Sequence, residues 1–176
     1  MREQFFRLRI SDQISRTLDI IGLPAQYTNV VAKSDFDKLD DNIVAYFRGE
    51  TVPEISGVLA HPSFLVCDDL NSLFQLYSPQ FQAKAIQLFA GEMESKENYL
   101  YWLPYIEPVN CLHSSTEKYS NGMLKHLVLD SRSLPYAPFF RLDGLLEDIV
   151  VISLPLAESI LRRCFYGIQL DPVEVK

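Results

Sequence analysis

The residues of this chain whose types and spacing could carry out chemistry are few. Cys111 and His113 stand two positions apart, and a thiol beside an imidazole is the combination that cysteine nucleophiles use. Such a nucleophile also needs a base held at hydrogen-bond distance and surroundings that stabilise the thiolate, which this spacing alone does not supply. Asp68 and Asp69 could act as an acid–base pair, but a position at the start of a helix explains them equally well. We interpret both pairs as structural.

Other signatures of catalysis or cofactor binding are missing from the sequence. The seven glycines are scattered and form neither GxGxxG nor GxxxxGK. His61, His113 and His126 lie far apart, with no HExxH and no zinc-type spacing. Ser153 stands in Ile-Ser-Leu-Pro rather than in GxSxG. We therefore expect no catalytic residue, no metal and no cofactor, in a protein that is not an enzyme.

Composition restricts the partners and the compartment. The formal net charge is −7, and a negative field repels nucleic acid and anionic membranes. The longest apolar run, residues 149–156, is far shorter than the roughly 20 residues that span a bilayer. Three cysteines cannot all pair with one another, and none stands in a CxxC arrangement. We expect a cytoplasmic protein with free thiols and with neither nucleic acid nor membrane as a partner.

Two segments of the chain, residues 64–88 and residues 149–170, follow the same pattern. Each has a short apolar run, then apolar residues at helical spacing, then a second apolar run that closes on Ile-Gln-Leu. Apolar residues at i, i+3, i+4 and i+7 form one stripe of a helix that faces a sheet. The spacing predicts helices over 68–77 and 154–164, within two strand–helix–strand units that form a possible internal repeat.

Details of these helices also follow from the sequence. Cys67 aligns with Ser153, and a serine there is a natural N-cap. Asp68 or Asp69 is expected to cap the first helix. In the second helix Cys164 is expected to be buried on the inner face, and Gly167 to end the helix.

Further strands are predicted where apolar residues alternate or run together between turn signals. They cover residues 6–10, 43–47, 99–106, 127–129 and 139–142. We expect an α+β fold with a mainly antiparallel sheet, in which residues 1–176 form a single compact domain. Residues 1–60 make an unassigned N-terminal lobe, and residues 61–176 contain both strand–helix–strand units.

Several short motifs occur in a recognisable order: Phe-Leu-Val-Cys-Asp-Asp-Leu at 64–70, Tyr-Leu-Tyr-Trp at 99–102, Val-Asn-Cys-Leu at 109–112, Leu-Val-Leu-Asp at 127–130, Phe-Arg-Leu-Asp-Gly at 140–144, Val-Val-Ile-Ser at 150–153 and Gly-Ile-Gln-Leu-Asp-Pro-Val at 167–173. Over about residues 60–175 this order resembles a bacterial family first described as a domain of unknown function and later classed among the immunity proteins of polymorphic toxin systems. Such families begin a helix with Val-Ser where this chain has Val66-Cys67.

The resemblance implies a non-catalytic protein that binds and neutralises a cognate toxin, and it leaves homodimer formation open. Tyrosines and acidic side chains suit such a contact, because tyrosine dominates binding hot spots and charge complementarity speeds association. Trp102 is interpreted as core, whereas the tyrosines on the opposite face of its strand could be core or surface. The expected contact residues are Asp35, Asp37, Asp40, Asp41, Tyr99, Tyr101 and Tyr105. The alternative is a small enzyme or ligand-binding module with a pocket between the two strand–helix–strand units.

Overall fold

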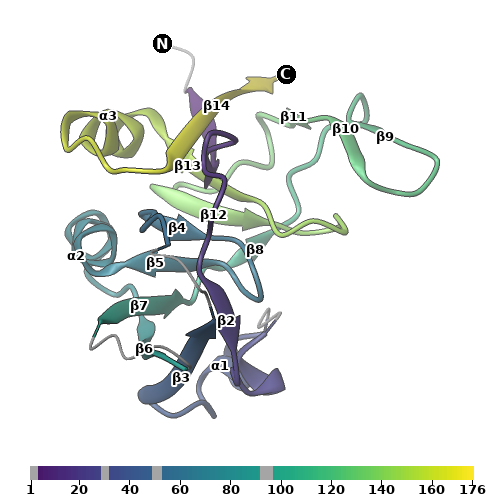
Figure 1. Ribbon diagram of the computed structural model, residues 1–176. Coiled ribbons are helices and arrows are strands. Elements are labelled where there is room, and N and C mark those ends of the chain that lie inside the picture. Colours follow the sequence, from purple (N-terminus) through teal and green to yellow (C-terminus); the bar gives the residue numbers. More distant parts are fainter. Residues whose placement is uncertain (1–3, 29–31, 49–52, 92–96) are drawn as a thin grey trace. The chain divides into compact units, whose positions relative to one another are not determined.

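The computed structural model describes residues 4–28, 32–48, 53–91 and 97–176, which form an α+β fold dominated by sheet (Figure 1). Two compact units can be distinguished. Unit 1 comprises Met1–Arg9, Ile106–Cys164 and Gln169–Lys176, and unit 2 comprises Ile10–Tyr105 and Phe165–Ile168. The boundary expected near residue 60 therefore lies inside unit 2, and the expectation of a single domain stays a prediction.

Unit 2 is built on one six-stranded sheet. In spatial order its strands are β2 (Asp19–Ile21), β3 (Asn42–Arg48), β6 (Ala83–Ala90), β7 (Asn98–Pro104), β5 (Leu65–Cys67) and β4 (Val58–Leu59). β3 and β6 run parallel, and the other neighbours run antiparallel. The predicted strand over 43–47 is confirmed as β3, and the one over 99–106 as β7, which ends two residues earlier, at Pro104.

One face of this sheet is buried under the segment that precedes β3. Ala45 and Phe47 of β3 and Ile86 and Leu88 of β6 point into this core, where alternate residues of a strand must share a face. The covering segment contains the short helices η1 (Ala25–Tyr27) and α1 (Lys33–Phe36). Its buried side chains are Leu18, Tyr27, Phe36 and Leu39.

The opposite face of the sheet carries α2 (Asp68–Tyr77), which packs on β5 and β7. Its buried residues Leu70, Leu73 and Phe74 form the predicted apolar stripe, so the predicted helix is confirmed at both ends. The N-cap is Cys67, whose side chain makes no capping hydrogen bond. The expectation that Asp68 or Asp69 is the cap is wrong: both lie in the first turn, where their charge favours the helix dipole.

Unit 1 contains a second six-stranded sheet and a separate hairpin. The sheet has the order β11 (Val128–Leu129), β14 (Ile168–Val175), β1 (Phe5–Ile10), β13 (Val150–Ser153), β12 (Phe139–Leu142) and β8 (Pro108–Val109). The hairpin is formed by β9 (Glu117–Lys118) and β10 (Leu124–His126). In the described sheets as a whole, antiparallel pairings outnumber parallel ones, as predicted.

The helix of unit 1, α3 (Leu154–Arg162), follows β13 and packs against it. Ser153 occupies the N-cap position without a side-chain capping bond, and Ile160 faces inward. Two expectations for the end of this helix are wrong. The helix ends at Arg162 rather than at Gly167, and Cys164 beyond it is exposed with a φ of 52° rather than buried. A cysteine outside the last turn no longer follows the helical stripe.

The two sheets share an order of strands. In unit 2 the spatial order is β4–β5–β7–β6–β3. Helix α2 connects β5 to β6, and the antiparallel strand β7 lies between them. In unit 1 the spatial order is β12–β13–β1–β14–β11. Helix α3 connects β13 to β14, and β1 lies between them. β3 pairs parallel with β6, and β11 pairs parallel with β14. The N-terminal strand thus takes in unit 1 the position that β7 takes in unit 2.

A buried hydrogen-bond relay holds three segments of unit 2 together. The Tyr101 hydroxyl donates to the Ser56 carbonyl oxygen at 2.6 Å, and Ser56 Oγ donates to the Gly167 carbonyl oxygen at 2.9 Å. Gly167 has a φ of +71°, and a Cβ there would lie 2.5 Å from Ser56 Oγ, so only glycine fits.

Replacing Tyr101 by Phe should destabilise the protein by about 1–3 kcal/mol, because a buried carbonyl loses its hydrogen-bond donor. The matched control is Tyr99→Phe, which removes a hydroxyl that bonds to exposed Glu97 and should change stability by no more than about 0.5 kcal/mol. Urea unfolding followed by circular dichroism measures both. Equal effects of the two substitutions would show that the relay does not stabilise unit 2.

Candidate functional site

The four aspartates expected to contact a partner lie together in unit 2, at the turn that leads from α1 into β3. All four are exposed, as predicted. Three of them form ion pairs: Asp35 with Lys38 at 3.1 Å, Asp41 with Lys84 at 2.6 Å, and Asp37 with Lys33. The backbone N–H of Asp40 donates to the Tyr27 hydroxyl at 3.1 Å. The negative charge of this segment is therefore largely offset by lysines.

Two of these lysines also lie over aromatic rings. Lys33 Nζ is 5.1 Å from the ring centroids of both Phe36 and Tyr105, and Lys84 Nζ is 5.2 Å from the Phe36 centroid. Such cation–π contacts stabilise an ammonium group at the surface. The hydrogen bond and the charge of Lys84 hold the pKa of Asp41 below its usual range. The turn is thus a packed and charge-balanced element.

The three tyrosines have different environments. Tyr101 is only 1% exposed, so its ring belongs to the core and is not on the surface where a partner could contact it. Tyr99 is half-buried against Phe47, and burial together with Glu97 raises the pKa of its phenol to about 12. Tyr105 is half-buried against Phe36. Trp102, which we interpreted as core, is half-buried: it lies on the other side of β7 from Tyr101, at the start of α2, where its indole N–H donates to Asp68.

Sequence reasoning missed a set of apolar side chains on the outer side of the unit 2 sheet. Val44, Tyr46 and Phe89 are 53%, 48% and 38% exposed. The register pairs Tyr46 with Phe89 on one side and with Ile21 on the other, and it aligns Val44 with Leu100 across Gln87. We call Ile21, Val44, Tyr46, Phe89 and Leu100 the open face.

The open face exists because α2 covers only part of the sheet. A helix with its side chains is about 10 Å across, and neighbouring strands are about 4.8 Å apart. α2 can therefore cover about two strands, and it lies over β5 and β7, leaving the outer sides of β6, β3 and β2 beyond it. Figure 1 shows α2 alongside β5, with β6 and β3 farther along the sheet.

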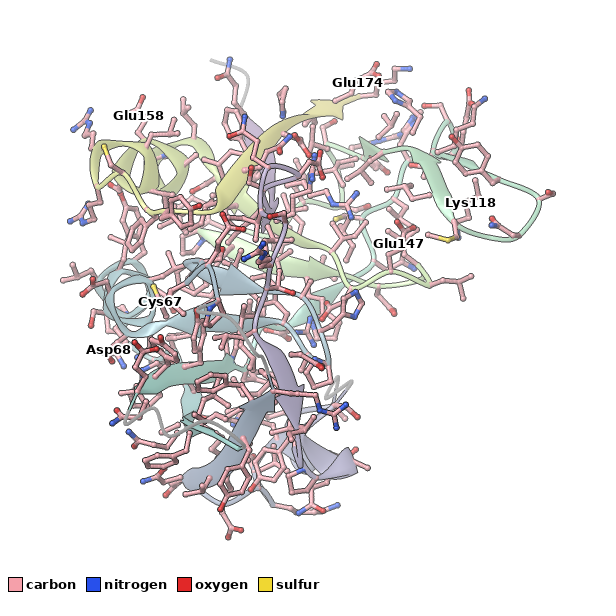
Figure 2. All side chains as sticks on the ribbon, in the orientation of Figure 1. Cys67, Asp68, Lys118, Glu147, Glu158 and Glu174 are labelled. Atoms are coloured by element: carbon pink, nitrogen blue, oxygen red, sulfur yellow. The ribbon has the colours of Figure 1, made fainter. Side chains whose placement is uncertain are left out.

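Acidic residues stand at the ends of the strands that form the open face. Asp19 lies two residues before Ile21 on β2, opposite Arg48. Exposed Glu97 directly precedes β7. Asp68 Oδ1 accepts a hydrogen bond of 2.8 Å from Trp102 Nε1, at the start of α2 where Figure 2 labels Cys67 and Asp68. Asp19 and Asp68 thus lie near the open face, Asp19 opposite the exposed Arg48, whereas Glu97 is bonded by the Tyr99 hydroxyl on the core side of the sheet.

The net charge of the chain is concentrated in unit 2. Its residues include thirteen Asp and Glu against six Lys and Arg, a formal charge of −7. Unit 1 has ten residues of each sign and is formally neutral. A single sign of charge on one unit produces a field that steers charged partners towards it.

Unit 2 also contains a pocket of about 410 Å³ between the two edge strands β2 and β4. Its lining is mostly apolar, with two titratable side chains, and consists of Ile10, Thr17, Leu18, Asp19, Ile20, Leu59, Ala60, His61 and Pro62. This volume is in the range of small-molecule sites.

The pair Cys111 and His113 has a buried thiol and an imidazole that is hydrogen-bonded to a serine. Cys111 is 1% exposed, and burial together with the charge of Asp130 raises the pKa of its thiol to about 11. His113 Nδ1 shares a 2.7 Å hydrogen bond with Ser115 Oγ. A buried, protonated thiol is a poor nucleophile. In the part of the chain that the structure describes, no three His, Cys, Asp or Glu side chains gather where they could hold a metal ion.

Comparisons with known proteins add no family: no protein-family model matches this chain, and no curated protein matches it. Among the described residues, no helix has the length and apolar character needed to cross a membrane.

The three free thiols should react in a fixed order with a thiol reagent such as DTNB near pH 8. Cys164 is exposed and should react first, Cys67 is half-buried with a thiol pKa raised by burial and should follow slowly, and Cys111 should react only on unfolding. Mass spectrometry of partly labelled protein identifies the modified residues. Rapid labelling of Cys111 in the folded protein would contradict this assignment.

Proposed function

We propose that this protein is an immunity-type protein, which binds and neutralises a cognate bacterial toxin without catalysis. The observation that carries the proposal is that the whole formal charge of −7 lies in the unit that also exposes an apolar sheet face. Charge complementarity raises the association rate with a basic protein, while buried apolar contacts slow its dissociation. The ordered motifs over about residues 60–175 resemble immunity proteins and support the same reading.

Binding is favoured over turnover by the state of the reactive groups. The buried Cys111 thiol has a raised pKa, and His113 bonds to Ser115 rather than to a nucleophile. Carboxylates that could act as acids or bases, such as Asp68, are instead engaged by Trp102. A stoichiometric binder in the cytoplasm needs none of these groups for chemistry.

The acidic turn and the half-buried tyrosines retain a proposed role in that contact. Asp35, Asp37, Asp40 and Asp41 are exposed and contribute to the field of unit 2, although their lysine partners weaken it locally. Tyr99 and Tyr105 offer only part of their rings. We assign the four aspartates to early electrostatic attraction rather than to the anchoring contact, since exposed charges act mainly on association.

The pocket of unit 2 is the observation that favours a second candidate function. A mostly apolar pocket with Asp19 and His61 at its wall suits a small ligand with one polar group. An ordered small molecule in this pocket, recovered with protein purified from its native cell, would favour a ligand-binding module.

The proposed toxin contact is tested by co-expression with the product of a toxin gene that adjoins the gene for this protein. We expect restored growth, a stoichiometric complex, and an association rate that falls steeply when salt is raised, because exposed charges are screened beyond about 8 Å at physiological ionic strength. Replacing the four aspartates of the acidic turn by asparagine should slow association at low salt and leave dissociation unchanged. A lack of both protection and complex formation would contradict the proposal.

We also infer that the two strand–helix–strand arrangements are an internal repeat, in which β1 completes the second copy. The shared strand order and the shared parallel pairing support this inference. A circular permutant that joins Lys176 to Met1 by a flexible linker and opens the chain after Asp12 should then fold cooperatively. A matched permutant opened within β6, after Gln87, should fail to fold. Failure of the first permutant under conditions where the wild type folds would count against the repeat.

A further inference from the structure

We propose that the open face of unit 2 is the docking surface for the toxin, and that it takes a basic element whose apolar side chains lie on Tyr46 and Phe89. This inference rests on the proposed function and names the surface and the chemistry of the partner. Lysines or arginines of that element would complement the negative formal charge of unit 2.

The first argument is that the side chains of Val44, Tyr46 and Phe89 do not pack in the core of unit 2. Val44 and Tyr46 alternate along β3 with Ala45 and Phe47, which fill the core on the other side of the sheet. Phe89 likewise alternates with the buried Leu88. Aromatic rings on an exposed strand face next to a helix leave apolar area in water, and contiguous apolar area with a polar rim marks a protein contact.

The second argument concerns the occupant. A second copy docking on this face through the same face would bring together two units that each carry a formal charge of −7. Like charges across an interface cost affinity, whereas a basic element meets the negative field of unit 2 favourably. The charge of unit 2 therefore selects a basic heterologous protein.

The third argument is a comparison with the other exposed apolar residues. Tyr119, Met123 and Leu146 lie on or beside the β9–β10 hairpin of unit 1, which is formally neutral. A Cβ on Gly122 would lie 2.9 Å from Leu146 Cδ1, and Lys118 Nζ donates to the Gly144 carbonyl oxygen at 2.8 Å. These contacts link the hairpin to its neighbouring loop, and the neutral charge of unit 1 gives a basic partner no electrostatic reason to bind there.

The test is the affinity of the full chain for the neighbouring toxin, in the form of an inactive variant, measured by isothermal titration calorimetry. Tyr46→Thr and Phe89→Thr keep residues that favour strands, and each should raise Kd at least tenfold, through faster dissociation. The matched controls Tyr119→Thr and Leu146→Thr should leave Kd within about threefold, as expected outside a hot spot. Asp19→Asn combined with Glu97→Gln should slow association at low salt only.

Each outcome has a defined meaning. Equal binding by the wild type and both open-face variants, with unchanged thermal unfolding, would overturn the docking surface and leave the proposed function in place. If sedimentation velocity showed that the wild type self-associates and that the Tyr46→Thr variant does not, a second copy would occupy the face. That result would also overturn the proposal. No binding by the wild type would overturn the proposed function together with the partner named here.

Discussion

A single short helix cannot cover a six-stranded sheet, and the surface of unit 2 follows from this constraint. α2 is ten residues long and packs on β5 and β7. The opposite face of the sheet is closed by a long irregular segment with Tyr27 and Phe36 in its core. Sequence positions on β3 and β6 that alternate with core residues must therefore face either α2 or water. Val44, Tyr46 and Phe89 face water, which is the property that a binding protein can use.

The two units differ in their formal net charge. Both units pack one helix of nine or ten residues on a sheet, yet the excess of acidic residues belongs to unit 2 alone. In unit 1 the charges are balanced, and ion pairs such as Arg9 with Asp171 and buried Arg141 with Asp148 tie strands and loops together. Burial would raise the pKa of Asp171, but hydrogen bonds from Arg9 and Gln169 together with the charge of Arg9 hold it below its usual value. Charge is balanced in unit 1, whereas unit 2 keeps an excess of acidic residues beyond its ion pairs.

The local elements could be predicted from the sequence, but their outward faces could not. The periodicity of apolar residues located α2, α3, β3 and β7, because burial of one stripe or run leaves a direct pattern in the chain. The segment around Tyr101 and Trp102 is apolar on both sides, so alternation could not say which ring is core. The open face could not be predicted for the same reason, because β3 is continuously apolar from Ile43 to Phe47 and shows no alternation. The place of β1 between β13 and β14 depends on a contact between the two ends of the sequence, which no local pattern encodes.

The central claim is that the partner lies on the outer side of β3 and β6. Hydroxyl-radical footprinting of the complex, read by mass spectrometry, reports on it directly because aromatic side chains are oxidised in proportion to their exposure. The account predicts that oxidation of Tyr46 and Phe89 falls strongly when the toxin binds, while that of exposed Tyr119 and Tyr136 is unchanged. Protection of Tyr119 or Tyr136 with Tyr46 and Phe89 still oxidised as in the free protein would contradict it.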